Sequence, residues 1–542
     1  MYTFESLRLQ YKPKIPNQLK HLLGLQAKPV YCPEKIPTEL KTLFPKSYNF
    51  PLIEFEFTDV KKKFPLKVGV VFSGGPAPGG NNVLAGIFDA IKKFQPNSQL
   101  IGFLDGPDGL LKRKTRNIFQ EDIAQIKNLG GFDFLSTGRG KIETIEQKEV
   151  ALKIVEDLSL DGLIIIGGDD SNTNAAALAE FFLEKGCKTK VIGVPKTIDG
   201  DLKNQYIEIS FGFDTASKTY AHTIGSLLKD ALSQKKYYFF VKLMGRSASH
   251  IALECALATH PTYTLISEEI KEEKQNLRDV VVLLSDIICH RAKENKNYGL
   301  FLIPEGSIEF FNDVQTLIRE INNYPKENLT QVIKNHLSKE AKTLFEDLPQ
   351  EIQKQFLLER DPHGNVQVTK IETERLILEL VQKELKKRKE EGSYQGSFSP
   401  QAIFLGYEGR SAMPSNFDAN YCYALGLTAA LLIKHGLTGY MAGITHLNEP
   451  VEAWTPIGLP LISMMGFENR QGKEKAVIKK ALVDLKGAAF DLYKEWRLKW
   501  AYEDHFQFPP PIQFFGPHEF SDQLPLTLKL DAMKTNEYRY VM

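Results

Sequence analysis

Cysteine is scarce in this sequence, and none of it stands at a metal-binding or redox spacing. Five cysteines are scattered over 542 residues, with no CxxC pair and no His/Cys ligand pattern. This excludes a disulfide framework and a structural zinc site, and it predicts a reduced, cytoplasmic protein. Long apolar runs are also lacking, since none approaches the roughly 20 residues that a membrane helix needs. The first residues, MYTFESLRLQ, lack the apolar core of a signal peptide, so we expect neither membrane insertion nor export.

An excess of charge of either sign is missing as well. Lysine and arginine number 68, and aspartate and glutamate 67, for a net charge of +1. This balance offers no electrostatic reason to expect nucleic acid or an anionic membrane as a partner. What the chain does have is length, because 542 residues are too many for a single core and predict two or three domains.

The stretch DGLIIIGGDDSNTN begins the region with most of the candidate chemistry. Its apolar run at 163–166 predicts a strand that is buried on both faces of a parallel sheet. Gly167 and Gly168 end the run, and we expect Ser171 or Asn172 to cap the helix that follows. Backbone N–H groups and the helix dipole at such a junction suit a phosphate oxygen, although a plain tight turn explains the glycines equally well.

Two acids, Asp169 and Asp170, follow these glycines directly. At the start of a helix they could simply be favourable partners of its dipole. Beside a bound phosphate they would repel the ligand unless a cation intervened. A phosphate site at this junction therefore requires Mg²⁺.

A second junction repeats the pattern about thirty residues later. The run at 191–194 predicts a strand that Pro195 ends, and Lys196 and Asp199 then fall at its carboxyl end, where open α/β sheets collect ligands. A lysine and an acid three residues apart can also pair in solvent, which adds little stability. If they face the first junction instead, they supply the cation and the base that phosphoryl transfer needs.

A glycine loop at 73–80 follows a predicted strand over Lys67 to Phe72. The loop lacks the GK[ST] ending of a P-loop and the GxGxxG of a dinucleotide site, so both of those interpretations lose support. Glycine would still let a phosphate approach the backbone closely, and a structural turn is the alternative. Farther along, Arg139 and Lys141 either contact a phosphoryl donor or are solvated, and KIET is expected to begin a helix.

Two later strand ends also carry charged side chains. Tyr237 to Leu243 predicts a strand, and Arg246 is expected at the amino terminus of the next helix, over 247–257. Its charge opposes the helix dipole there, so either a carboxylate or a substrate phosphate would satisfy it. Glu305, just past another predicted strand, either caps a helix or accepts hydrogen bonds from sugar hydroxyls.

These motifs together resemble the long, pyrophosphate-dependent members of the phosphofructokinase family. The ordered set carries the resemblance, which covers nearly the whole chain, because GGD alone also occurs in other kinases. The segments that match are GGDDSNTN (167–174), PKTIDGD (195–201), LMGRSASHIALECAL (243–257), IPEG (303–306), LLERDPHGNVQVTKIETE (357–374) and GYEGRSAMPSNFDANYCYALG (406–426).

The resemblance implies a reversible glycolytic reaction, the Mg²⁺-dependent transfer of a phosphoryl group from pyrophosphate to the 1-hydroxyl of fructose 6-phosphate. It makes Asp199 the base, Lys196 the cation that stabilises developing charge, and Asp169 the Mg²⁺ ligand. The pyrophosphate would lie on Gly75, Gly167 and Gly168. The sugar phosphate would be bound by Thr197, Ile198, Asp199, Met244, Gly245, Arg246, Glu305, Tyr407 and Arg410, with Lys236 and Tyr237 coming from the other subunit of a homodimer with a shared active site.

The resemblance also implies the fold, two Rossmann-like three-layer α/β domains with a helical insertion and N- and C-terminal extensions. The expected division is 1–66 (N-terminal extension), 67–213 with 409–466 (phosphoryl-donor domain), 214–307 with 399–408 and 467–542 (sugar-phosphate domain and C-terminal cover), and 308–398 (helical insertion). The segments MAGITHLNEP and EAWTPIG and helices from Lys473 to Trp500 are expected as outer shell and cover. His363, in DPHGN, is expected to be structural.

The choice of donor depends on Asp170 and Lys196, because ATP-dependent members of the family carry glycine at both matching positions. Asp170 would place negative charge and bulk where the α-phosphate of ATP must pass, and Lys196 would compensate for a smaller donor. An ATP-dependent kinase and a non-catalytic regulatory subunit are the alternatives. The second of these would be expected to lose the base or the cation, whereas Asp199, Asp169 and Lys196 are all present.

Overall fold

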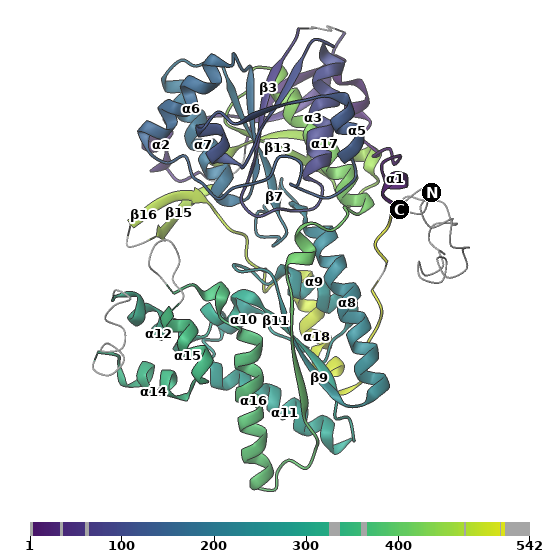
Figure 1. Cartoon of the computed structure of the whole chain (residues 1–542), viewed down its shortest axis with the longest axis vertical. Helices are drawn as coiled ribbons and strands as arrows, with labels where there is room; N and C mark the ends of the chain where they lie inside the picture. The colour runs from purple at the N-terminus through teal and green to yellow at the C-terminus, as the bar shows by residue number, and fades with distance from the viewer. Residues whose placement is uncertain are drawn as a thin grey trace, which may run out of the picture.

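Two lobes, each built on one sheet, make up the computed structural model of the chain (Figure 1), which describes residues 4–32, 36–59, 64–324, 336–358, 366–470, 473–509 and 511–514. The larger sheet has the strand order β1-β2-β14-β13-β7-β6-β3-β4-β5, with β8 paired to β7. The smaller sheet has the order β10-β11-β9-β12. Among the described residues no helix is both long and apolar enough to span a membrane.

The centre of the large sheet is parallel and covered on both faces. Its strands β3, β6 and β7 pair in parallel, and successive side chains of β6 enter different cores: Ile164 and Ile166 join one apolar cluster, Leu163 and Ile165 the other. This confirms the prediction of a strand buried on both faces. The central strands and their covering helices are β3 (Lys67–Ser73), β4 (Gln99–Phe103), β6 (Gly162–Gly167), β7 (Lys190–Thr197), β8 (Phe211–Gly212), α3 (Gly80–Phe94), α6 (Ile145–Asp157), α7 (Asp169–Glu184) and α17 (Asn416–Lys434).

Segments from both ends of the chain extend this sheet. β13 (Tyr440–Thr445) pairs in parallel with β7, so MAGITHLNEP is not outer shell as expected, but begins inside a buried strand. β14 (Thr455–Pro460) pairs antiparallel with β13 and with β2. The prediction of EAWTPIG as outer shell was therefore also wrong, because its second half is part of the sheet. The remaining strands and helices of this lobe are β1 (Leu25–Val30), β2 (Leu52–Phe57), β5 (Thr115–Ile118), α1 (Phe4–Arg8), α2 (Leu40–Leu43), α4 (Pro107–Leu111) and α5 (Gln120–Ile126).

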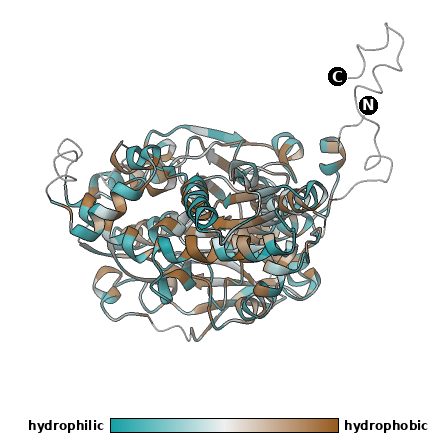
Figure 2. Ribbon diagram, turned by 90° about the horizontal axis from the view of Figure 1, so that it is seen from below, coloured by the Kyte–Doolittle hydropathy of each residue, from teal (hydrophilic) through white to brown (hydrophobic). Residues whose placement is uncertain are grey.

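The small sheet is parallel throughout and has its own helical layers. β9 spans Tyr237–Leu243, as its aromatic and β-branched residues predict. In Figure 2 the helices alternate hydrophobic and hydrophilic residues, as amphipathic helices packed on a core do. The other elements of this lobe are β10 (Tyr263–Thr264), β11 (Gly299–Pro304), β12 (Ser399–Leu405), α8 (Phe213–Gln234), α9 (His250–Thr259), α10 (Ser267–Glu272), α11 (Leu277–Lys293) and α18 (Ala488–Tyr502).

The described residues between β11 and β12 are mainly helical, as their charge and periodicity predict. These helices share an apolar cluster with α11 and with the face of β9 that carries Tyr238 and Phe240. Their bounds are α12 (Asn312–Asn322), α14 (Lys339–Asp347), α15 (Gln350–Leu358) and α16 (Thr373–Glu390). His363 lies outside the described residues, and the division into domains stays a prediction.

A hairpin replaces the helix expected from Lys473 onward. β15 (Met465–Arg470) and β16 (Lys473–Ile478) pair antiparallel, and the helix α18 begins only at Ala488. The sequence EKAVIKKAL suits a helix locally, but pairing with the preceding strand decides its conformation. The prediction failed because that pairing is not a local property of the segment.

Candidate active site

Three strands of the large sheet end side by side, and their following turns form one surface. Ser73 of β3 is in register with Gly167 of β6, which is in register with Pro195 of β7. The hydroxyl of Ser171 donates to Ser73 Oγ at 2.8 Å, which ties the β3 and β6 turns together. Gly74 has φ +86°, and a Cβ added there would lie 3.5 Å from Lys196 Nζ. The two predicted junctions therefore do face one another.

The turn after β6 is built differently from the expectation. Helix α7 begins at Asp169 with Gly168 as its N-cap residue, so neither Ser171 nor Asn172 caps it. Asn172 instead turns back and its Nδ2 donates to the carbonyls of Gly167 (2.7 Å) and Gly168 (2.9 Å). These bonds hold the glycine turn in place and leave both acids, Asp169 and Asp170, in the first turn of the helix, where its dipole favours them.

Lys196 lies inside the end of β7. The strand does not end at Pro195 as predicted, but continues to Thr197, because its pairing with β13 stops at Gly193 and the last two residues pair with β8. Lys196 is only 7% exposed. Burial lowers the pKa of its ammonium to about 8, although Asp199, Asp169 and Asp201 act to raise it. The cation is thus held among carboxylates near the three turns.

Asp199 lies in the loop after β7 and is partly buried. Burial and, next, the charge of Glu305 raise its pKa, while Lys196, Lys480 and Arg246 act in the opposite direction. A carboxylate with a raised pKa is a better proton acceptor than an exposed one. The site therefore contains a carboxyl with a raised pKa and three cations near it.

A threonine organises this loop. Thr197 Oγ1 donates to Asp201 Oδ1 at 3.1 Å and accepts from the N–H of Asp199 at 3.0 Å. Burial, followed by the charges of Asp199 and Asp169, raises the pKa of Asp201 to about 6. Sequence reasoning assigned Asp201 no role, although the motif PKTIDGD contains it. Ile198, predicted at the sugar site, packs in the core and is 5% exposed.

The small lobe contributes the loop after β9. Helix α9 begins at His250 with Ser249 as its N-cap residue, later than the predicted start at 247, so Arg246 lies in the preceding loop and not at the helix amino terminus. Gly306 packs on this loop, because a Cβ added there would lie 1.7 Å from the Arg246 carbonyl. Gly245 has φ +129°, a conformation that favours glycine, and Met244 is buried.

Glu305 lies beside this loop, at the start of the short helix η2 (Glu305–Glu309), and is 9% exposed. Burial raises its pKa, whereas Lys242, a backbone N–H, Arg410 and Arg246 act to lower it. A buried carboxylate facing two arginines can accept hydrogen bonds from hydroxyl groups. Its predicted role at a sugar stays a prediction.

Arg410, predicted at the sugar phosphate, lies beside the glycine loop at 73–80. It ends the short helix η5 (Tyr407–Arg410), and a Cβ added to Gly75 would lie 3.8 Å from its guanidinium carbon. Tyr407 is 70% exposed, with the Arg410 guanidinium 5.2 Å from its ring centre. Lys141 reaches Asp170, with Nζ 3.4 Å from Oδ2, and its segment is not helical, because α6 begins at Ile145 with Thr144 as a capping residue.

Two residues predicted at this site lie far from it in the same chain. Lys236 and Tyr237 stand at the beginning of β9, whereas the loop with Arg246 follows its end. The strand has seven residues, which places them roughly 20 Å from that loop. Their assignment to the site of another subunit stays a prediction.

Sequence reasoning missed Lys480 entirely. Its Nζ lies 3.6 Å from Asp169 Oδ2 and 2.7 Å from Ser247 Oγ. The local sequence IKKAL carries no motif that would have identified it, since only the crossing of the chain between lobes brings it here.

Known proteins match this chain over most of its length. The phosphofructokinase family model matches residues 67–433. The pyrophosphate–fructose 6-phosphate 1-phosphotransferase of Porphyromonas gingivalis is 46% identical over 536 residues, 97% of this chain and 98% of its own. The beta subunit of the enzyme of the same name from Solanum tuberosum is 49% identical over 504 residues, 92% of this chain and 89% of its own.

Solved structures agree on the fold. The crystal structure of a pyrophosphate-dependent phosphofructokinase from Marinobacter aquaeolei has a TM-score of 0.54 at 16% identity, covering 83% of this chain and 98% of that one. This likeness concerns the fold alone and confirms the predicted two-domain α/β class. Taken with the family model and the relatives that share nearly half of its residues, it shows that the chain belongs to the phosphofructokinase family.

Proposed function

We propose that this protein transfers a phosphoryl group from pyrophosphate to the 1-hydroxyl of fructose 6-phosphate, giving fructose 1,6-bisphosphate and phosphate in a reversible glycolytic step. The observation that carries the proposal is the closeness of Asp199 and the buried Lys196 beside the turns after β3 and β6. Relatives 46% to 49% identical carry the corresponding name, which supports the same reaction here. The scattered cysteines favour a cytoplasmic setting.

Asp199 is the proposed base. It receives the proton of the attacking hydroxyl late in the transfer, because an ordinary carboxylate cannot remove that proton fully beforehand. Its burial raises its pKa, which favours this proton transfer. The bond between its N–H and Thr197 Oγ1 positions the loop for the reaction.

The donor is proposed to lie on Gly75, Gly167 and Gly168, in reach of Lys196. Glycine at these turns lets phosphate oxygens approach backbone N–H groups. The Lys196 ammonium, desolvated and surrounded by acids, would stabilise charge on the bridging or equatorial oxygens of the moving group.

Asp169 is the proposed ligand of Mg²⁺. Among the described residues no group of three or more His, Cys, Asp or Glu forms a ready metal cage. This fits Mg²⁺, which usually takes one or two carboxylates and completes its shell with substrate phosphates and water. Asp169 and Asp201 lie close enough to repel one another, and a cation bound by their oxygens would relieve that repulsion. Bound there, Mg²⁺ would neutralise charge on the phosphates.

The sugar phosphate is proposed to bind between the lobes. Glu305 would hold its hydroxyls, and Arg246 its phosphate as a bidentate donor. The other proposed contacts come from Thr197, Met244, Gly245, Tyr407 and Arg410, with Lys236 and Tyr237 of a second subunit.

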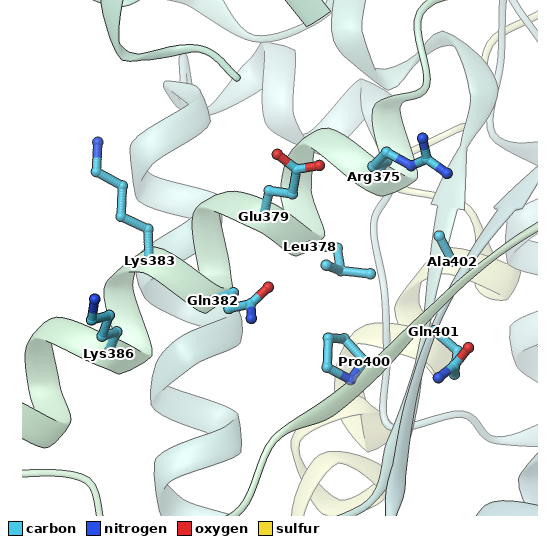
Figure 3. A pocket seen from close by; sticks show the side chains of 9 residues that line it. All are labelled: Arg375, Leu378, Glu379, Gln382, Lys383, Lys386, Pro400, Gln401 and Ala402. Atoms are coloured by element: carbon cyan, nitrogen blue, oxygen red, sulfur yellow. The ribbon is translucent and has the colours of Figure 1, made fainter. Parts of the chain in front are cut away.

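The second subunit is proposed to dock along β12, the edge strand of the small sheet. An exposed groove, shown in Figure 3, lies between this strand and α16 and includes Pro400, Gln401 and Ala402. Ser399 is paired with Tyr237 and Leu405 with Leu243. A two-fold axis across the middle of β12 would therefore place the start of one β9 level with the end of the other, where Arg246 follows.

Subunit mixing tests this shared site. We expect Lys236→Ala to raise KM for fructose 6-phosphate about tenfold or more, since it removes a charge-assisted bond to phosphate. Mixed with inactive Asp199→Asn protein and allowed to exchange subunits, it should regain sugar affinity, because one site of each hybrid has both native residues. A mixture that shows no gain over its two components would contradict the shared site.

Asp170→Gly tests the choice of donor. The carboxylate stands in the first turn of α7, 45% exposed, and pairs with Lys141. We expect the wild type to use pyrophosphate and not ATP, and the variant to lose part of its pyrophosphate activity while gaining measurable ATP turnover, because charge and bulk leave the path of the α-phosphate. A coupled assay with each donor decides this. Comparable wild-type rates with both donors would contradict the assignment.

A further inference from the structure

Lys480 lies on a short segment that crosses between the lobes, and the mechanism above leaves it without a role. The segment joins β16 to α18, and Figure 1 shows it passing from the upper lobe to the lower one. Lys480 Nζ lies 2.7 Å from Ser247 Oγ in the small lobe and 3.6 Å from Asp169 Oδ2 in the large lobe. One ammonium thus joins the proposed metal ligand to the loop that carries Arg246.

The backbone on both sides of Lys480 is held firmly. The N–H of Lys479 donates to the Met464 carbonyl at 3.0 Å, and that of Ala481 to the Asp201 carbonyl at 2.7 Å. The Ala481 carbonyl accepts from His250 Nε2 at 3.0 Å. The main chain is therefore ordered on both sides of Lys480, and the hydrogen bond from Nζ to Ser247 Oγ at 2.7 Å fixes the end of the side chain. The ammonium is therefore preorganised at this position.

Fold stability gives a weak reason for placing a cation here. The pair with Asp169 is long at 3.6 Å, so it contributes less than a close, hydrogen-bonded ion pair would. The charge of Lys480 does reach the proposed base and two other carboxyls, since it acts to lower the pKa of Asp199, Asp201 and Glu309. It stands with Lys196 as a second ammonium group near Asp199.

We propose that Lys480 is a further binding residue for the diphosphate donor. Its ammonium would exchange the contact with Asp169 for a donor oxygen once that carboxylate holds a cation, while the hydrogen bond to Ser247 keeps it between the lobes. Lys196 and Lys480 would then hold the diphosphate from two directions, one from β7 and one from the crossing segment. This inference rests on the proposed function, because it requires a diphosphate beside Asp169.

Calorimetric titration of the full-length protein with imidodiphosphate, a diphosphate with a non-hydrolysable bridge, tests the inference in the presence of Mg²⁺. Lys480→Met keeps the length of the side chain and removes its charge, so we expect a Kd about tenfold to a hundredfold weaker, with unchanged affinity for fructose 6-phosphate. Lys480→Arg should restore much of the affinity. Lys486→Met is the matched control, an exposed lysine on the same segment, and it should bind as the wild type does.

The outcomes separate this inference from the proposed function. Wild-type affinity for imidodiphosphate in Lys480→Met overturns the inference, as does a loss of affinity confined to fructose 6-phosphate. A lowered melting temperature that Lys480→Arg does not restore, with both ligands affected equally, assigns Lys480 a structural role and also overturns it. Failure of the wild type itself to bind imidodiphosphate or to turn over pyrophosphate would instead refute the proposed function.

Discussion

Asp199→Asn should lower kcat by roughly 10²- to 10⁴-fold, the usual range for the loss of a positioned general base. Asparagine has nearly the same shape and keeps the backbone bond to Thr197 Oγ1, so we expect the loop to remain in place. It cannot accept the hydroxyl proton, and transfer then depends on water alone. The measurement is steady-state turnover with pyrophosphate, with direct titration of fructose 6-phosphate to show that the sugar site is retained.

A matched substitution makes this result specific. Asp491→Asn changes an exposed carboxylate on α18 and should leave kcat within twofold of the wild type. Burial and the charge of Glu305 raise the pKa of Asp199, so ionising this carboxyl costs folding free energy, and the melting temperature of Asp199→Asn should be equal to or above that of the wild type. Turnover within tenfold of the wild type would mean that another group takes the proton.

Lys196→Met should lower kcat by about 10²- to 10³-fold without unfolding the protein. The ammonium is buried near the ring of Phe132, 5.9 Å from its centre, where a thioether packs well. The variant loses stabilisation of the moving phosphoryl group but no longer needs to bury a charge. We therefore expect activity and stability to change in opposite directions, measured by turnover and by thermal unfolding.

The pH dependence of activity gives a second test of the proposed role of Lys196. Its pKa is lowered from 10.5 to about 8, so kcat/KM for pyrophosphate should fall as the pH rises through about 8 and the ammonium loses its proton. Between about pH 8 and 10.5, Lys196 is protonated in the unfolded chain and largely deprotonated in the folded one. The free-energy cost of burying its charge is therefore lost as the pH rises through this range. Lys196→Arg stays protonated there and should move the fall in kcat/KM to higher pH. An unchanged pH profile would show that another group causes the fall in kcat/KM at high pH.

Local sequence predicted the strands that are buried along nearly their whole length. The run at 163–166 was identified because it is continuously apolar, and the strand over Tyr237–Leu243 because of its aromatic and β-branched residues. The predicted starts of helices were less accurate, since a capping hydrogen bond depends on the fold around it. Asn172 binds the glycine carbonyls instead of capping α7, and Arg246 precedes α9 by a loop.

Pairings between distant segments could not be predicted in the same way. Nothing in the composition of 440–445 indicates that it lies beside β7, nor does EKAVIKKAL show that it pairs with 465–470. Cross-strand packing decides such cases, and its partners are remote in sequence. The close approach of Arg410 to Gly75 belongs to the same class.

The sequence by itself determined the parallel α/β class and the grouping of Asp169, Lys196 and Asp199, because neighbouring parallel strands bring their carboxyl ends to one edge of a sheet. Only the tertiary structure decided how far these groups are desolvated and which residues complete the site. Burial sets the proton affinity of Lys196 and Asp199, and the crossing of the chain between lobes delivers Lys480. Both depend on long-range packing, which a local pattern of residue types does not contain.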